Sequence, residues 1–334
     1  MGNLPAVVLV LAAIAAVILV LDRMLPGPTS RAALALQHAV GGLRVRSVAI
    51  PGFTIAYLDG GSGEPLVLVH GIGADKDNFA PIVPWLRGVG RVIALDLPGF
   101  GESSKPIDGD YSIDAQAGRL GQFLDALALP RVHLAGSSMG GAIVLTFARL
   151  HPARVGSLWL LAPAGIGNAT ESEMLRRHRE HGEYPLFAAT PDEYAGVMQI
   201  CFTRTPFVPY CVRHELAIAA IRNYPLHTRI FRELVAQPFT LEQAVAGLPT
   251  PALIVWGDQD RVLDVSGAEV LHRALPASRM VTMPGVGHLP MLEAPRRTAA
   301  DYRAFRASLR RIAAPQAAAG ASGVSARRAG GTAT

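Results

Sequence analysis

The sequence predicts an α/β fold in which a mostly parallel sheet is flanked by helices. Short apolar runs alternate with segments of helical periodicity along most of the 334 residues. Strands that are buried on both faces have continuously apolar sequences, so this alternation is typical of a parallel sheet covered by helices. A hydrophobic content of 50% is ample for such a core. The predicted strands cover residues 66–69, 92–95, 132–135, 158–161, 253–256 and 280–283, and the predicted helices cover residues 78–87, 113–127, 139–150, 265–275 and 295–312.

An antiparallel hairpin is predicted before the first parallel strand. Apolar residues recur at about every second position in residues 45–50 and again in residues 53–58, as in strands with one buried face. Pro51-Gly52 between them is a turn signal. We therefore expect the folded core to begin at about Val45.

The N-terminus carries an uncharged apolar segment, PAVVLVLAAIAAVILVL, over residues 5–21. Its length is at the lower limit for a helix that crosses the hydrocarbon core of a bilayer. A signal peptide is the main alternative, but it would need a positively charged start and a small-x-small cleavage site directly after the apolar run. A buried core helix is disfavoured because the segment has no polar face. We expect residues 1–22 to be a retained transmembrane anchor, followed by a linker over residues 23–44.

The charges that flank this segment suggest an orientation. No Lys or Arg precedes it, whereas Arg23, Arg31, Arg44 and Arg46 follow it closely. The positive-inside rule then predicts that the catalytic domain lies on the cytoplasmic side.

One long stretch interrupts the alternation of strands and helices. Residues 166–248 contain helical pieces separated by prolines and no strand signal. We expect a helical cap here, inserted between two parts of the core at residues 45–165 and 249–312, over the sheet edge where α/β proteins bind ligands. Residues 313–334, rich in Ala, Gly and Ser, are predicted to be a disordered tail.

Composition excludes several other functions. The net charge is +5, but no basic run is interleaved with aromatic residues, so no nucleic-acid partner is expected. Cys201 and Cys211 are the two cysteines, and a bridge between them stays open. No Cys/His cluster has the spacing of a zinc site, and no cofactor is expected. The oligomeric state is left open as well.

Ser138 is the candidate nucleophile. It is the central residue of a G-x-S-x-G pentapeptide, Gly136 to Gly140, which lies between a predicted strand and a predicted helix. A serine on such a sharp turn needs small neighbours, and its hydroxyl stands at the start of the following helix, where the amides favour negative charge. The glycine spacing selects Ser138 over Ser137.

His288 and Asp260 are the candidate base and orienting acid. A serine needs a histidine within reach to become a nucleophile, and His288 follows the last predicted strand. Most other histidines lie on helical or insertion segments, His227 among them, where we expect solvent-facing roles. Asp258 and Asp260 both follow the strand at 253–256, and we choose Asp260, with Asp258 as a turn former.

The oxyanion of an acyl-transfer intermediate needs two amides directed at one point. One is expected from Met139, the residue after the nucleophile, and the other from Ile72, in the loop after the strand at 66–69. The segment 96–101 is expected to be a structural turn.

These motifs resemble the α/β-hydrolase superfamily over about residues 45–312. A closer resemblance is to the membrane-anchored monoacylglycerol lipases of the α/β-hydrolase-domain group and to related bacterial lipases. It rests on residues 70–77, 111–114, 136–141 and 256–268. The resemblance implies an α/β-hydrolase fold, a membrane segment at residues 5–21, a catalytic aspartate at Asp260, oxyanion amides at Ile72 and Met139, and hydrolysis of monoacylglycerols and related lipid esters.

The leading hypothesis is therefore a serine hydrolase that acts on lipid esters through an acyl-enzyme on Ser138. An alternative keeps the same three residues and hydrolyses a carbon–carbon bond in ring-cleavage products. A remote alternative is a membrane scaffold without catalytic activity. Its mark would be a degenerate set of site residues, and the sequence shows none.

Overall fold

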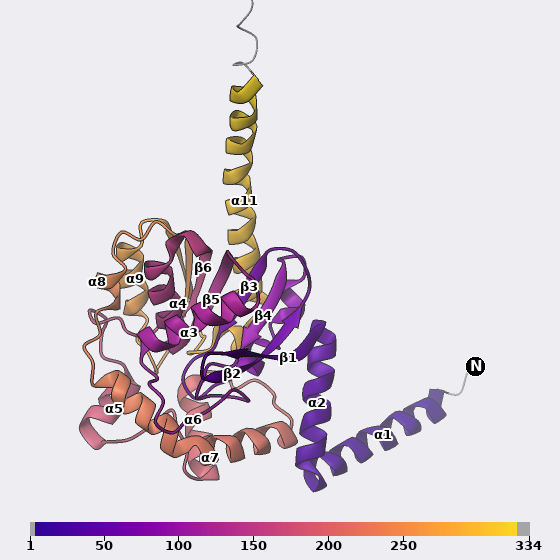
Figure 1. Cartoon of the computed structure of the whole chain (residues 1–334). Helices are drawn as coiled ribbons and strands as arrows, with labels where there is room; N and C mark the ends of the chain where they lie inside the picture. The colour runs from indigo at the N-terminus through magenta and orange to yellow at the C-terminus, as the bar shows by residue number, and fades with distance from the viewer. Residues whose placement is uncertain (1–3, 326–334) are drawn as a thin grey trace, which may run out of the picture.

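The computed structural model describes residues 4–325, and these form one eight-stranded sheet with helices on both faces (Figure 1). The strand order is β1-β2-β4-β3-β5-β6-β7-β8. β1 and β2 form the predicted hairpin, with Ile50 opposite Phe53. β2 pairs antiparallel with β4, and every later pairing is parallel, which confirms the predicted fold class. The strands are β1 (Leu43–Ile50), β2 (Phe53–Gly60), β3 (Pro65–Val69), β4 (Arg91–Leu95), β5 (Val132–Ser137), β6 (Val155–Leu161), β7 (Ala252–Gly257) and β8 (Ser278–Met283).

The helices of the core follow the strands they connect. They are α3 (Ile113–Ala126), α4 (Met139–Leu150), α9 (Ser266–Ala274), α10 (Pro290–Glu293) and α11 (Pro295–Ser325), with short 3-10 helices η1 (Lys76–Phe79), η2 (Val83–Leu86) and η3 (Pro152–Arg154). The single helix predicted at residues 78–87 is wrong, because η1 and η2 take its place. Pro81 and Pro84 lack the amide hydrogen that a continuous α-helix needs, so the segment breaks into two tight turns.

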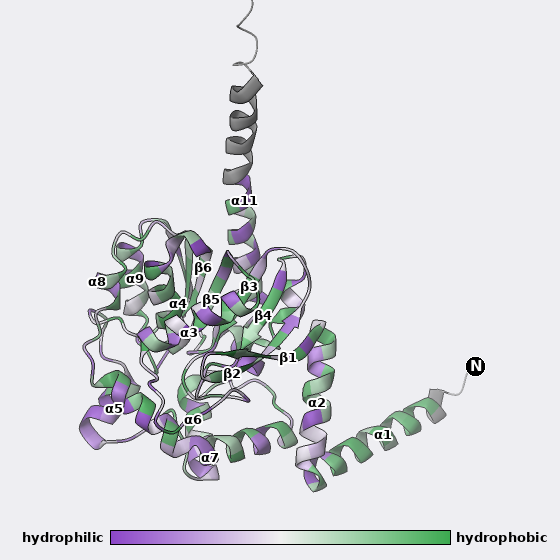
Figure 2. Ribbon diagram, viewed as in Figure 1, coloured by the Kyte–Doolittle hydropathy of each residue, from purple (hydrophilic) through white to green (hydrophobic). Residues whose placement is uncertain are grey.

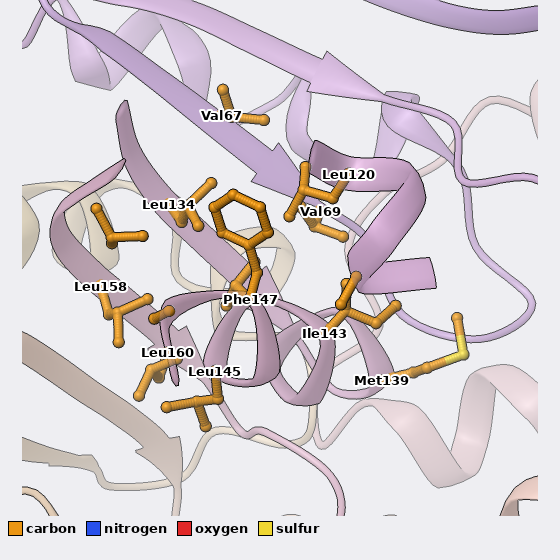
Figure 3. Close-up of a cluster of buried hydrophobic side chains, with 14 of the residues drawn as sticks. Val67, Val69, Leu120, Leu134, Met139, Ile143, Leu145, Phe147, Leu158 and Leu160 are labelled. Carbon is orange, nitrogen blue, oxygen red and sulfur yellow. The ribbon is translucent and has the colours of Figure 1, made fainter. Parts of the chain in front are cut away.

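Each face of the sheet has its own hydrophobic core. Alternate residues of a strand point to opposite faces. Val67 and Val69 of β3 pack with Phe147 of α4 on one face, whereas Leu66 and Leu68 pack on the other. Figure 3 shows the first core, with the Phe147 ring between the strands and α4. In the second core the Trp159 and Tyr302 rings stack with centroids 4.1 Å apart.

The insertion between β6 and β7 is helical, and no strand occurs within residues 166–248. Its helices are α5 (Glu173–His181), α6 (Pro191–Cys201), α7 (Tyr210–Val235) and α8 (Leu241–Ala244). α5, α6 and α7 gather at one end of the sheet (Figure 1). The insertion has a small core of its own that includes Phe187, Ile200 and Phe231, and Val262 of the core domain packs into it.

The N-terminal region is more regular than a linker would be. Helix α1 (Leu4–Met24) is apolar up to Leu21 and long enough to cross a bilayer, a property that signal sequences share (Figure 2). Residues 23–44, predicted as a linker, contain helix α2 (Pro26–Gly41), which packs against α7. Pro26 suits a first helical turn, and Gly42 ends the helix in a left-handed conformation, with φ of 65°.

The C-terminal helix extends further than the sequence predicts. α11 continues to Ser325, although we expected a disordered tail from Ala313. Alanine has the highest helix propensity of all residues, which accounts for continuation through this Ala-rich stretch. The rest of the predicted tail, residues 326–334, lies outside the described residues.

The packing of Phe147 predicts a large stability loss on truncation. We expect Phe147→Ala to lower the free energy of unfolding by roughly 3–5 kcal/mol, because a fully buried aromatic ring would leave a cavity between sheet and helix. Leu150→Ala, in the same helix but 48% exposed, is the matched control and should cost much less. Chemical denaturation in detergent measures both, and equal losses would contradict this account.

Candidate active site

Ser138 lies on a strained turn between β5 and α4. Its backbone has φ of 54° and ψ of −121°, a conformation that residues other than glycine rarely adopt. Two hydrogen bonds fix it there: the Ser138 amide donates to the Leu161 carbonyl at 3.0 Å, and the Ala164 amide donates to the Ser138 carbonyl at 3.0 Å. The end of β6 and the loop after it therefore hold the turn that presents the serine.

The two glycines of the pentapeptide are required by close backbone contacts. A Cβ on Gly136 would lie 2.3 Å from the Gly140 carbonyl oxygen, and a Cβ on Gly140 would lie 2.2 Å from the Val69 carbonyl oxygen. Both distances are far below van der Waals contact. Small residues at these positions allow α4 to start directly against the end of β3.

Asp260 and His288 come together although 28 positions separate them in the chain. They follow β7 and β8, and His288 Nδ1 lies 2.8 Å from Asp260 Oδ2. The other carboxylate oxygen, Oδ1, accepts hydrogen bonds from the amides of Val262 at 2.8 Å and Leu263 at 2.9 Å. With its Nδ1–H donating to the carboxylate, a neutral imidazole presents an unprotonated Nε2. That is the tautomer a general base requires.

Asp258 has a different environment from Asp260. Its carboxylate accepts a hydrogen bond from the Gly285 amide at 2.7 Å and so ties the loop after β7 to the turn after β8. This is a turn-forming contact, and it leaves Asp260 as the carboxylate that meets His288.

Ser138 and His288 are both nearly buried, with 6% and 3% of their surfaces exposed. They follow parallel strands, so both lie at the carboxyl edge of the sheet. Within residues 4–325, however, no hydrogen bond joins Ser138 Oγ to the His288 ring. Nucleophile–base hydrogen bonds are commonly long in enzymes without substrate and shorten when it binds.

The loop after β3 lies against the serine. A Cβ on Gly71 would be 3.0 Å from Ser138 Cβ and 3.6 Å from Ser138 Oγ. His70 is buried and braces this loop: its Nδ1 donates to the Gly71 carbonyl at 2.7 Å, and its Nε2 accepts from the Leu97 amide at 2.9 Å. Burial lowers the pKa of His70, consistent with a neutral ring.

The residues expected to supply the oxyanion amides are Ile72, which follows Gly71 in this loop, and Met139, which follows Ser138. Met139 begins α4, where the first-turn amides have no helical partner (Figure 3). In the described part of the chain neither amide donates a hydrogen bond to another backbone or side-chain group. Neither amide is therefore engaged by another group of the protein among the described residues, as the expected oxyanion role requires.

A buried charge network beneath the loop carries no obvious signal in the sequence. Asp96, in the predicted structural turn, accepts hydrogen bonds from the Lys76 amide at 2.7 Å, from Lys76 Nζ at 3.1 Å and from the Glu102 amide at 2.7 Å. Asp75, which is half-buried, precedes Lys76 in the chain. Burial, with the nearby charges of Asp77 and Asp96, raises the pKa of Asp75 to about 7.

His227 corrects the expectation that the insertion histidines face solvent. It is buried, its ring stacks on Phe100 with centroids 4.7 Å apart, and its Nε2 lies 3.2 Å from the Gly99 carbonyl oxygen. Burial lowers the pKa of His227 to about 4, so the ring is neutral at physiological pH. It packs α7 onto the turn at residues 96–101.

The insertion also holds the loop that carries His288. The His288 amide donates to the Cys201 carbonyl at 2.9 Å. Glu293 accepts hydrogen bonds from the Gly287 amide at 2.9 Å, the Thr203 amide at 3.3 Å and the Arg204 amide at 2.8 Å. Sequence reasoning missed Glu293, because nothing local marks a carboxylate that joins segments about 90 residues apart.

No bridge joins the two cysteines, which are both free and buried. Within residues 4–325 no group of three or more His, Cys, Asp or Glu side chains could hold a metal ion. The polar groups of the site are therefore those of a serine, a histidine, a carboxylate and backbone amides, the set used by hydrolases with a nucleophilic serine.

Comparison with known proteins agrees with this class. Residues 64–188 match the family model described as the alpha/beta hydrolase fold. Lipase 3 of Moraxella sp. (strain TA144) is 35% identical, covering 85% of this chain and 91% of its own length. Human monoacylglycerol lipase ABHD6 is 32% identical, covering 73% and 75%. The chain belongs to the α/β-hydrolase family.

Solved structures give the same result. A membrane phospholipase A, described as a bacterial virulence factor, has a TM-score of 0.83 and 37% identity, covering 92% of this chain and 98% of its own. A serine hydrolase of carbazole degradation, the CarC enzyme, has a TM-score of 0.68 and 26% identity, covering 79% and 98%.

The raised pKa of Asp75 predicts a pH dependence of stability. The ordinary pKa of an Asp carboxyl is 3.8, so the folded state binds the Asp75 proton more tightly than the unfolded state does. The stability that this protonation contributes is lost as pH rises towards about 7. Asp75→Asn keeps an oxygen acceptor but cannot ionise. We therefore expect the free energy of unfolding of the variant, relative to the native chain, to increase from pH 4 to pH 8.

Asp110→Asn is the control for this measurement. The Ser112 hydrogen bonds to the Asp110 carboxylate lower the pKa of Asp110, so its contribution has the opposite sign and is lost as pH falls. Chemical denaturation in detergent at several pH values compares the variants. A difference between Asp75→Asn and the native chain that does not change with pH would contradict the prediction.

Proposed function

We propose that this chain is a serine hydrolase of lipid esters, with Ser138 as nucleophile, His288 as general base and Asp260 as the orienting carboxylate. The observation that carries the proposal is the Asp260–His288 hydrogen bond of 2.8 Å, at the sheet edge where Ser138 stands on its strained turn. The Ser138 hydroxyl and the Asp260–His288 pair thus lie at one edge of one sheet, which supports the proposed triad.

The mechanism follows from these positions. Ser138 Oγ attacks the ester carbonyl carbon while His288 Nε2 takes the hydroxyl proton, and the amides of Ile72 and Met139 bind the resulting oxyanion. The tetrahedral intermediate then breaks its bond to the alcohol oxygen, which receives the proton from His288. Water, deprotonated by the same imidazole, attacks the acyl-enzyme and releases the carboxylic acid. Asp260 stabilises the imidazolium in both halves of the reaction.

Monoacylglycerol-type esters are the substrates that we propose. The support is the printed activity of the relatives, lipases and monoacylglycerol lipases at 30–35% identity over most of the chain, together with the apolar N-terminal helix. The insertion of residues 166–248 acts as the cap that selects among them, because it contacts the loops of both Asp260 and His288. The carbon–carbon hydrolase alternative has weaker support, a 26% identical CarC enzyme.

Covalent labelling tests the nucleophile. We expect a fluorophosphonate probe to label the native chain in membranes and not Ser138→Ala, which should also lose ester turnover. Ser137→Ala is the matched control: this buried neighbour has no hydrogen-bond partner for its hydroxyl among the described residues and should leave labelling intact. Asp260→Asn should lower kcat on the order of 10⁴-fold by removing the correct tautomer. Labelling of Ser138→Ala would overturn the assignment.

Substrate comparison separates the two activities. Turnover of a monoacylglycerol series by the native chain should exceed turnover of a vinylogous diketone, the chemistry of ring-cleavage products. The opposite ranking would favour the carbon–carbon hydrolase. A folded native chain that neither reacts with the probe nor turns over esters would favour the scaffold.

Helix α1 is proposed to be a retained anchor with the catalytic domain on the cytoplasmic side. The support is the absence of Lys and Arg before the apolar run and the arginines that follow it. A green fluorescent protein fused to the C-terminus should fluoresce in a bacterial host, whereas an alkaline phosphatase fusion should be inactive. Active phosphatase would reverse the orientation, and a mature chain that starts after Leu21 would identify a signal peptide instead.

A further inference from the structure

The segment between α6 and α7, residues 202–209, presents an apolar tip. Phe207 is 93% exposed, more than any other large hydrophobic side chain among those described. Prolines flank it at positions 206 and 209, so the backbone is stiff and has few amide donors. Because Phe207 is continuous with Pro206, Val208 and the apolar residues Ile18 and Leu19 around one cavity, it is part of an apolar surface suited to an apolar phase.

This segment lies beside the end of helix α1. A cavity of about 480 Å³ separates them, lined on one side by Ile18 and Leu19 of α1 and on the other by Pro206, Phe207 and Val208. Asp22, Arg23 and Arg213 line the same cavity. It therefore combines an apolar floor from both segments with two cationic side chains and one carboxylate, which already accepts a hydrogen bond from the Cys211 amide.

The contact between α1 and α7 is specific. The Asp22 carboxylate accepts a hydrogen bond from the Cys211 amide at 2.9 Å, which satisfies one of the free amides in the first turn of α7. The Arg23 guanidinium lies 4.5 Å from the centroid of the Tyr210 ring. These contacts fix the start of α7, which directly follows residues 202–209, relative to the last turn of the apolar helix.

The depth of the segment follows from helix geometry. Asp22 and Arg23 are the first charged residues of α1, so they mark the level at which it leaves the hydrocarbon core. Leu19 is three residues earlier, about 4.5 Å deeper at the usual helical rise. Because Phe207 shares a cavity with Ile18 and Leu19, it stands at the boundary between headgroups and acyl chains whenever α1 spans the bilayer.

We propose that residues 204–209 form a second membrane contact, with Phe207 inserted at the lipid interface and with Arg23 and Arg213 placed for the phosphates of lipid headgroups. This inference rests on the proposed membrane anchoring of α1. Phenylalanine is one of the apolar residues that interfacial segments bury at the acyl-chain boundary, and arginine joins an apolar stem to a charged head that can stay among the headgroups.

The other end of the same segment reaches the catalytic histidine. Residues 201–204 bond to the His288 loop through the Cys201 carbonyl and through Glu293, which accepts amides from Gly287, Thr203 and Arg204. Only Thr205 and Pro206 separate the last of these residues from Phe207. The segment thus connects the bilayer surface to the loop that positions His288. Glu293 is a positioning residue where residues 201–204 contact that loop.

An environment-sensitive label tests the contact directly. The chain with Phe207→Cys, carrying a nitrobenzoxadiazole label, is reconstituted in vesicles of phosphatidylcholine and phosphatidylglycerol. The native cysteines are buried, and each labelled variant is compared with a native chain treated in the same way. We expect a blue-shifted emission that is quenched by lipids with a nitroxide on a shallow acyl carbon. Leu150→Cys, at the far end of α4, is the matched control and should show neither effect.

Ile14→Cys separates this proposal from the anchor on which it rests. Ile14 lies in the middle of the apolar run, so its label reports whether α1 is inserted. Deep quenching at Ile14 with no quenching at Phe207 would overturn the second contact and leave the anchor intact. No quenching at Ile14 would overturn the anchor and this proposal together.

Activity gives an independent readout. Phe207→Ser should lower kcat/KM for a long-chain monoacylglycerol in vesicles by roughly tenfold or more. This is the loss expected when the free energy of transferring a large apolar side chain from water into the bilayer is removed. Its activity on a soluble short-chain ester should be unchanged, and Leu150→Ser should change neither. Equal losses of Phe207→Ser on both substrates would mean a structural defect and would overturn the contact.

Glu293→Gln tests the contact between this segment and the His288 loop. Its amide nitrogen cannot accept the hydrogen bonds that a carboxylate oxygen accepts, so the His288 loop loses part of its support. We expect kcat to fall with both the soluble and the vesicle substrate, and the pH profile of kcat/KM on the soluble ester to shift. A lower melting temperature with an unchanged pH profile and kcat would leave Glu293 only a structural role.

Discussion

The strained backbone of Ser138 is the constraint to which much of the core is adapted. A residue other than glycine in this conformation costs on the order of 1–3 kcal/mol and persists only where its surroundings over-determine it. Here Leu161 of β6 accepts from the Ser138 amide, and Ala164 of the loop after β6 donates to the Ser138 carbonyl. Gly136 lies so close to α4, and Gly140 so close to the end of β3, that neither position admits a side chain. The two hydrophobic cores, one on each face of the sheet, keep these strands in place.

A second constraint is electrostatic. The loop that contacts Ser138 is supported by buried charges, with Asp96 completely enclosed and hydrogen-bonded to Lys76 and to the Glu102 amide. Removing either partner of such a buried pair leaves an uncompensated charge, which is far more costly than the pair is stabilising. The neutral His70 and His227 rings complete the packing on the other side, joined through Phe100. The loop is thus fixed by groups that take no part in the proposed reaction.

The residues of the candidate site can be proposed from the sequence because each follows a strand. Parallel strands end at one edge, so motifs after β3, β5, β7 and β8 converge there whatever the distance along the chain. What sequence reasoning missed depends on contacts between distant segments. The burial of His227 is set by Phe100, and the clamp at Glu293 is set by residues about 90 positions earlier. Helix α2 was missed because its polar and small residues resemble a linker until α7 is packed against it. The two turns at η1 and η2 are a different case, since Pro81 and Pro84 in the sequence are themselves a signal that a helix over residues 78–87 breaks.

The position of the insertion links these observations to a membrane substrate. Helix α1 makes its specific polar contacts with the insertion, through Asp22 and the Cys211 amide, and α2 packs on α7 as well. The insertion in turn holds the His288 loop and contacts the Asp260 loop, where the Met174 amide donates to the Arg261 carbonyl at 3.0 Å. An anchor attached elsewhere on the core would hold the protein at a bilayer equally well but would leave the orientation of the carboxyl sheet edge unspecified. Because α1 is attached through the insertion, the proposed anchor and the proposed lipid contact are both joined to the element that holds the Asp260 and His288 loops. The proposed membrane attachment and the candidate site thus share one structural support.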